Sequence, residues 1–154
     1  MKDSDNPGVL AFPPLIFAIF AAVGIGIHFL IPVHLLSYSL ALVIGIGMAL
    51  LAVALAIWAN GVMKAAGTNV RPDMPTLTIV RTGPYRFTRN PMYLSLCLAQ
   101  VAIAFVVDDW VALLLVIPLA LILHFGVVVR EERYLEAKFG AQYLALKKEV
   151  RRWI

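Results

Sequence analysis

The chain has 154 residues, of which 62% are hydrophobic and only 14% are charged, and its mean hydropathy is +0.88. Soluble domains are about half apolar and about a quarter charged, so this composition excludes an ordinary soluble domain and indicates an integral membrane protein. The net charge of +4 could suggest a nucleic-acid partner. The basic residues, however, flank the apolar runs in the pattern typical of membrane proteins, which argues against nucleic acid.

Four apolar runs without Asp, Glu, Lys or Arg predict four membrane spans. We place them at about 13–31, 35–62, 91–107 and 110–129, within one all-α membrane domain that covers residues 1–154. About 20 residues cross a bilayer, and the first and third runs approach the short limit of about 17. The first run resembles a secretory signal, but it lacks a small-residue cleavage site followed by soluble sequence, so we expect it to be retained.

The distribution of basic residues predicts the orientation of the spans. Lys and Arg occur before the first span, between the second and third, and after the fourth, whereas the opposite connections carry His34 or the pair Asp108-Asp109. Cytosolic segments carry such an excess of Lys and Arg. We therefore expect both termini and the loop 63–90 to face the cytosol, close to anionic lipid headgroups of a bacterial or archaeal cytoplasmic membrane.

Glycines within the first two spans favour close packing of helices. The sequence Gly-Ile-Gly occurs twice, at Gly24 to Gly26 and at Gly45 to Gly47. A nucleotide-binding turn would need a strand before the glycines and a helix after them, and neither copy has that context. We therefore interpret these glycines as helix contacts.

The segment 81–93 is the first of two motifs that indicate a binding site. It holds three arginines, a Gly-Pro turn and the pair Asn90-Pro91, which is typical of a helix start with Asn as the cap and Pro in the first turn. The amides of that helix would then point toward Arg86 and Arg89. Such a place favours an anion.

The second motif is Arg130-Glu131-Glu132-Arg133, which follows the fourth span directly. Because Asp108-Asp109 makes a tight connection, the third and fourth spans are predicted to form an antiparallel hairpin that brings both motifs to one membrane face. Apolar residues then recur at helical spacing, which predicts an amphipathic cytosolic helix over 131–150, with Gly140 as a point where it breaks or bends.

These motifs carry a resemblance to a known family. Gly83-Pro84-Tyr85-Arg86, Arg89-Asn90-Pro91-Met92-Tyr93 and Glu131-Glu132-Arg133-Tyr134-Leu135, followed by Phe139-Gly140 and Tyr143, resemble the isoprenylcysteine carboxyl methyltransferase and phospholipid methyltransferase superfamily. The match covers roughly residues 67 to 154. It implies S-adenosylmethionine as the methyl donor, held on the cytosolic side, and a lipophilic acceptor, a small molecule or a lipidated group, that enters from the bilayer.

The resemblance and the chemistry of the donor together predict the site. Arg89, Asn90 and Glu131 are the expected catalytic residues; Arg89 or the helix amides would bind the donor carboxylate, and a glutamate its hydroxyls or ammonium. The alternatives are that the arginines meet lipid phosphates and that the carboxylates form a solvated pair. The expected cofactor-binding residues are Gly83, Pro84, Tyr85, Arg86, Arg89, Asn90, Met92, Tyr93, Glu131 and Glu132.

Two further polar residues are candidates for contact with the acceptor. His124 lies seven residues before Glu131, about two turns deeper on the same helical face, where it either binds substrate or packs through a hydrogen bond. Asn60 lies at the cytosolic end of the second span. The other histidines, His28 and His34, belong to the outer side and cannot join His124 in a metal site, so we expect no metal.

The expected reaction is methyl transfer to a carboxylate of a prenylated cysteine or a similar acceptor. A carboxylate is nucleophilic near neutral pH, whereas the amine headgroup of a phospholipid, the alternative acceptor, must first lose a proton. Members of the superfamily commonly have His where this chain has Asn90, and Asn cannot titrate. A noncatalytic scaffold and a small transporter are the alternatives of another class. The oligomeric state stays open.

Overall fold

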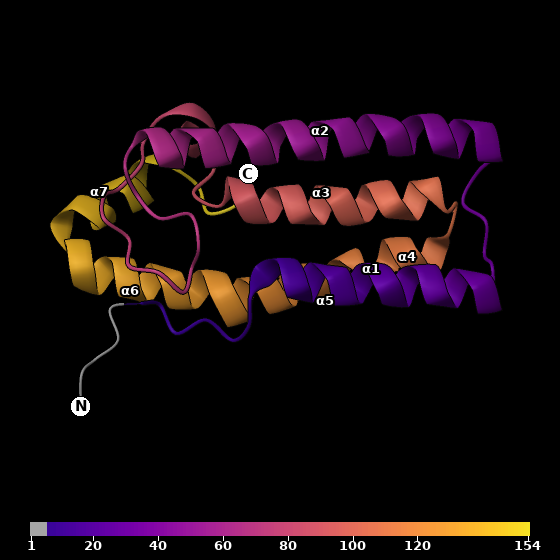
Figure 1. Ribbon diagram of the computed structural model, residues 1–154, viewed down its shortest axis with the longest axis horizontal. Coiled ribbons are helices and arrows are strands. Elements are labelled where there is room, and N and C mark those ends of the chain that lie inside the picture. The colour runs from indigo at the N-terminus through magenta and orange to yellow at the C-terminus, as the bar shows by residue number, and fades with distance from the viewer. Residues whose placement is uncertain (1–5) are drawn as a thin grey trace.

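Helices make up all the regular structure of residues 6–154, the part of the chain that the computed structural model describes (Figure 1). The first apolar helices of the chain are α1 (Pro13–Leu30), α2 (Tyr38–Ala65) and α3 (Pro91–Val106). A short 3-10 helix, η1 (Gly83–Arg86), precedes α3. After α3 come α4 (Trp110–Leu114), α5 (Val116–Leu123), the π-helical turn η2 (His124–Val128), α6 (Val129–Phe139) and α7 (Ala141–Glu149).

The shorter α3 lies in the middle of the bundle. It packs against α2 on one side and against α1, α4 and α5 on the other (Figure 1). The connections from α1 to α2 and from α3 to α4 lie at one end of the bundle, which we call the outer end. The opposite end, called here the charged end, holds α6, α7, η1, the loop 66–82, the segment 6–12 and the C-terminal residues 150–154 (Figure 1).

The bundle has the dimensions and surface of a membrane protein. The helices α1 and α2 and the stretch Trp110–Phe139 are long and apolar enough to cross a bilayer, and α3 is a shorter apolar helix of 16 residues. Large apolar side chains of α2 point outward, as shown by Val43, Leu50 and Ile57, which are 67–68% exposed. The prediction of an all-α membrane bundle is confirmed.

The helices after α3 differ from the predicted pattern. In place of one uniform span at 110–129 and a separate helix at 131–150, α4, α5, η2 and α6 follow one another directly. Pro118 lies within α5 and cannot donate a backbone hydrogen bond, so the chain is not one uniform α-helix. The predicted break at Gly140 is present: its φ of +50° ends α6, so residues 131–150 form two helices.

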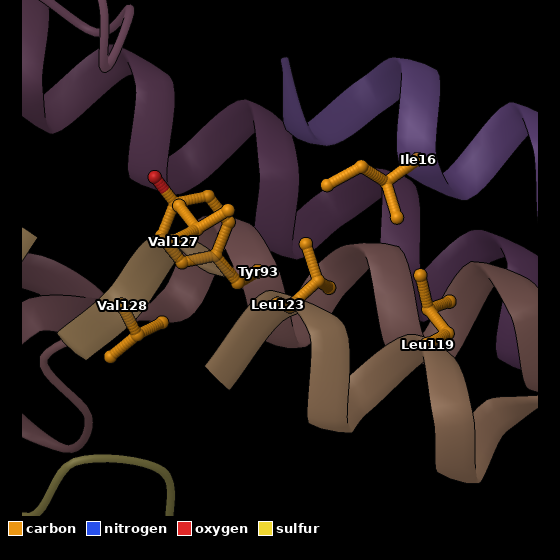
Figure 2. Packing of buried hydrophobic residues seen from close by; sticks show 6 residues of the cluster. All are labelled: Ile16, Tyr93, Leu119, Leu123, Val127 and Val128. Carbon is orange, nitrogen blue, oxygen red and sulfur yellow. The ribbon is translucent and has the colours of Figure 1, made fainter. Parts of the chain in front are cut away.

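A buried hydrophobic cluster lies beneath the charged end and joins α1, α3, α5 and η2. Its members are Ile16, Tyr93, Leu119, Leu123, Val127 and Val128 (Figure 2). Four of them, from Leu119 to Val128, are completely buried. The cluster therefore fixes α3 against the helical stretch that leads into α6, and these two elements carry the two charged motifs.

One glycine of each Gly-Ile-Gly copy lies at a close helix contact. A Cβ atom on Gly45 would lie 2.8 Å from the Val106 backbone nitrogen of α3, and one on Gly24 would lie 3.2 Å from the Ala112 Cβ of α4. Gly26 and Gly47 face open space. The packing interpretation therefore holds for the first glycine of each copy, because a Cβ atom would clash with α3 at Gly45 and would crowd α4 at Gly24.

Two aspartates organise the outer end. Asp109 is the N-cap of α4, and His28 lies 3.2 Å from its carboxylate. Asp108 has a φ of +53° and lies 3.1 Å from His34. The two carboxylates accept hydrogen bonds from the backbone amides of Val33, Leu35, Leu36, Val111 and Ala112. They therefore join the connection between α1 and α2 to the turn between α3 and α4.

Candidate functional site

A cavity of about 280 Å³ lies at the charged end. Its walls come from α2, η1, α3, α6, α7, the loop 69–80 and the segment that leads into the first residues of α1. Both charged motifs contribute to it, because the α3–α4 turn returns the chain antiparallel to itself. Of the predicted site residues, those that line the cavity are Tyr85, Arg89, Asn90, Met92, Tyr93, Glu131 and Glu132.

Arg89 and Glu132 form a buried ion pair across the two motifs. The Arg89 Nη2 atom lies 2.7 Å from Glu132 Oε1, and both side chains are less than 10% exposed. The Arg89 Nη1 atom donates to the backbone carbonyls of Lys147 and Val150 at the end of α7. A buried charge is costly without such partners, so the pair holds the start of α3, α6 and the end of α7 in one arrangement.

A second guanidinium binds the same carboxylate. Arg152 donates from Nε to Glu132 Oε1 at 2.9 Å and from Nη2 to Oε2 at 2.8 Å. This two-pronged geometry is the strong form of an arginine–carboxylate contact. Both oxygens of Glu132 are thus engaged by arginines.

Glu131 occupies a different environment from Glu132. Its Oε1 accepts a hydrogen bond of 2.6 Å from the hydroxyl of Tyr93, in the first turn of α3. The ring of Tyr93 belongs to the hydrophobic cluster, so packing fixes the position of its hydroxyl (Figure 2). Glu131 is therefore oriented by a neutral donor and keeps acceptor positions that a ligand can use.

Asn90 begins α3, but the prediction that its side chain caps this helix is wrong. The side chain makes no cap hydrogen bond. Its Nδ2 atom donates instead to the Arg152 carbonyl at 2.9 Å, and its backbone amide donates to Thr88 Oγ1 at 3.2 Å. The side chain of Asn90 thus connects α3 to the C-terminal segment, a contact that local sequence could not indicate.

Two buried polar atoms in the cavity wall have no hydrogen-bond partner within residues 6–154. They are the Tyr85 hydroxyl and the Arg89 Nε atom. Burial, together with the nearby Glu131 carboxylate, raises the pKa of Tyr85 well above its usual value, so this hydroxyl stays a neutral donor. Buried donors usually have partners, and two unpaired ones in a single cavity wall indicate a place for a polar ligand.

Other predicted site residues lie outside the cavity wall, among them Pro84, Arg86 and Asn60. Gly83 has a φ of +58°, and a Cβ atom there would lie 2.7 Å from Val62 Cγ2, so its role is to let η1 pack on α2. His124 accepts a hydrogen bond from Trp153 Nε1 at 3.1 Å. Of the two readings of His124, its surroundings match the packing element.

Sequence reasoning missed the residues after α7 and most of the loop before η1. Asn69, Thr76 and Ile79 line the cavity from the loop, and Tyr143 and Leu146 line it from α7. Arg152 reaches the site by binding Glu132. A signal was present in the run Arg151-Arg152-Trp153, because a tryptophan beside charged residues favours a partly buried position.

Comparison with known proteins identifies the family. The model of the family described as phospholipid methyltransferase matches residues 40–142, from the start of α2 to the start of α7. An uncharacterized protein of Haemophilus influenzae is 43% identical over 63 residues, which are 41% of this chain and the whole of that protein. Both charged motifs lie in the segment that the family model matches, whereas Arg152 lies beyond it. Because the match covers more than half of the chain, this protein belongs to the phospholipid methyltransferase family.

Proposed function

We propose that the protein transfers a methyl group from S-adenosylmethionine to a lipophilic acceptor that reaches the cavity from the bilayer. The observation that carries this proposal is a cavity walled by Arg89, Glu131 and Tyr85, in a membrane chain of a methyltransferase family. S-adenosylmethionine supplies a methyl group on a sulfonium, which a nucleophile displaces in line. For such a reaction the protein mainly has to orient the two reactants and exclude water.

The residues of the cavity fit this donor. The volume of about 280 Å³ is close to the lower end of ligand pockets, which is about 300 Å³. The donor has a carboxylate, an ammonium, a ribose diol and an aromatic base, so it needs cationic, anionic and apolar partners. Arg89 and Tyr85 have unpaired hydrogen-bond donors, and Glu131 is a hydrogen-bond acceptor. Met92 and Leu96 contribute apolar side chains to the cavity wall.

The geometry supports different roles for the two glutamates. Glu132 already accepts three hydrogen bonds from Arg89 and Arg152, so its role is to hold those arginines. Glu131 accepts only from Tyr93 within the described chain and is the carboxylate that accepts hydrogen bonds from the donor. Arg89 contributes its Nε atom to the donor carboxylate, beside the first amides of α3.

The preferred acceptor is a carboxylate, as in a prenylated cysteine. Asn90 cannot take a proton, and its side chain is already bound to the Arg152 carbonyl. An acceptor that is nucleophilic without losing a proton suits this position. The amine headgroup of a phospholipid is the second candidate; the family match favours it, and the Glu131 carboxylate in the cavity is a group that can receive its proton.

A methyl-transfer assay on purified protein tests the proposal. The protein is placed in lipid nanodiscs with methyl-labelled S-adenosylmethionine and either a farnesylated cysteine derivative or phosphatidylethanolamine. Labelled methyl ester supports the preferred acceptor, and labelled N-methyl lipid supports the second. Absence of saturable donor binding in calorimetry would overturn the proposal and favour a noncatalytic scaffold. Glu149→Gln, an exposed carboxylate outside the cavity wall, serves as the control.

A further inference from the structure

The C-terminal segment, residues 151–154, lies beyond the part of the chain that the family model matches. It nevertheless contacts three elements of the candidate site. Its backbone meets the start of α3, the Arg152 side chain meets α6, and the Trp153 side chain meets η2. Because the segment contacts three elements around the cavity, it can determine the shape of the cavity.

The backbone of this segment fixes the three residues that directly precede α3. The Arg151 carbonyl accepts the Arg89 amide at 3.0 Å, and the Arg152 carbonyl accepts Thr88 Oγ1 at 3.1 Å and Asn90 Nδ2 at 2.9 Å. Each of these bonds joins residues about 60 positions apart. The start of α3, and with it Arg89, is therefore held by chain that folds back from beyond α7.

The Arg152 side chain adds the second contact. Its guanidinium donates to both oxygens of Glu132 but does not line the cavity. Glu132 in turn holds the Arg89 Nη2 atom. Removing Arg152 would leave Glu132 with fewer positive partners and freer to rotate, and Arg89 would move with it.

Trp153 anchors the segment. Its ring packs against the hydrophobic cluster, and its Nε1 atom donates to His124 Nδ1 at 3.1 Å. The proton of a neutral His124 ring then lies on Nε2, so the contact of 3.4 Å between Nε2 and Arg152 Nη1 is no hydrogen bond. Glu132 is accordingly the partner that orients Arg152.

We propose that Arg152 is a positioning residue for donor binding, which acts by fixing Glu132 and, through it, Arg89. The effect on donor binding rests on the proposed function. The effect of Arg152 on the positions of Glu132 and Arg89 does not depend on that function. The neighbouring Arg151 offers a matched comparison, because its side chain is exposed and its contact is with the carbonyl of Ile154 at 3.5 Å.

The experiment compares Arg152→Ala with Arg151→Ala in the full chain, by amide hydrogen exchange and by calorimetry with S-adenosylmethionine. For Arg152→Ala we expect about tenfold faster exchange at the Arg89 amide and about tenfold weaker donor binding, and for Arg151→Ala no change. Arg152→Lys keeps the positive charge but lacks the planar guanidinium that donates to both oxygens of Glu132. It should therefore restore part of the affinity. In a Glu132→Gln background the effect of Arg152→Ala should largely vanish, which a general loss of stability would not produce.

The outcomes separate the two proposals. If the wild-type chain binds no donor, the proposed function fails, and the exchange rate at Arg89 still tests the positioning role. If the donor binds and Arg152→Ala behaves like Arg151→Ala in both measurements, the positioning role is overturned. If Arg152→Ala does not fold, Arg152→Lys with the Glu132→Gln background provides the comparison.

Discussion

The hydroxyl of Tyr93 lies 2.6 Å from the carboxylate of Glu131, although the two residues are 38 positions apart in the chain. This bond joins the first turn of α3 to the first turn of α6. It orients a carboxylate in the cavity through a side chain whose ring is packed in the hydrophobic cluster. The geometry of this pair leads to the first prediction.

Glu131→Gln is expected to weaken binding of S-adenosylmethionine by about ten- to a hundredfold, because an amide accepts hydrogen bonds less strongly than a carboxylate and offers only one acceptor oxygen. Calorimetry on protein in nanodiscs measures the affinity. Tyr93→Phe removes the orienting donor and should produce a smaller loss, with the two effects not additive. Equal affinities for wild type, Glu131→Gln and the control Glu149→Gln would contradict the assigned role of Glu131.

Glu132→Gln is expected to destabilise the fold by about 3 kcal/mol, because it leaves two guanidiniums without their shared carboxylate. Glu132 is only 5% exposed, so water cannot replace the lost partner easily. Thermal unfolding in detergent measures the loss. Glu136→Gln removes a carboxylate of the same helix, which binds Lys147 at a more exposed position, and should cost less than about 1 kcal/mol. Equal costs for both variants would refute the buried pair as a stabilising contact.

Gly45→Ala and Gly47→Ala are expected to differ although the two residues are neighbours in one helix. The new Cβ at position 45 would lie 2.8 Å from the backbone of α3, so the helices must separate, at a cost of about 1–3 kcal/mol. At position 47 the Cβ meets open space, and alanine should be neutral or stabilise α2 by up to about 1 kcal/mol. Denaturation in detergent compares the two variants; a destabilised Gly47→Ala with an unchanged Gly45→Ala would show that the packing of α2 on α3 is assigned wrongly.

Asp109 is expected to make the fold sensitive to acid at the outer end. Burial by itself raises the pKa of Asp109, but hydrogen bonds from the Val33 and Ala112 amides and from His28 outweigh burial, so the pKa lies below its usual value of about 3.9. The charged form is thus stabilised in the folded state. This contribution is fully present above the pKa of the unfolded chain and disappears as pH falls through the lower folded value.

The free energy of unfolding of wild type should therefore fall as pH decreases below about 4, and Asp109→Asn should lower it at neutral pH and make it less dependent on pH in that range. Chemical denaturation from pH 7 to pH 3 provides the measurement. Asp73→Asn, at an exposed residue paired with Arg71, is the comparison. Parallel pH profiles for wild type and Asp109→Asn would contradict this prediction.

The charged end is expected to face the cytosol, because it carries Lys and Arg whereas the outer connections carry none. In a Cys97→Ala background, single cysteines at positions 148 and 34 report the two sides. An impermeant maleimide added to intact cells should label position 34 but not position 148, and disrupted cells should show labelling at both. Labelling of position 148 in intact cells would reverse the orientation.

The sequence predicted much of the fold because membrane helices follow simple rules. Charge-free apolar runs gave the apolar helices within a few residues, and the short turn at Asp108-Asp109 implied that α3 and the stretch after it are antiparallel. That antiparallel return was enough to place Arg89 and Glu132 together, and the structure confirms this with a distance of 2.7 Å. The break at Gly140 was also visible, as a glycine within an otherwise helical pattern.

Only the tertiary structure determined the hydrogen-bond partners of the polar residues in the candidate site. Local rules predicted that Asn90 caps its own helix, yet its side chain binds the carbonyl of Arg152, and Glu132 binds an arginine 20 residues further on in addition to Arg89. Helical periodicity and charge act over a few residues or across one turn, so the sequence by itself determined the membrane helices, their antiparallel return and the charges at one end. Contacts of a buried polar group depend on every segment that packs around it, so the different hydrogen-bond partners of Glu131 and Glu132 follow from the way α3 and the C-terminal segment pack against α6.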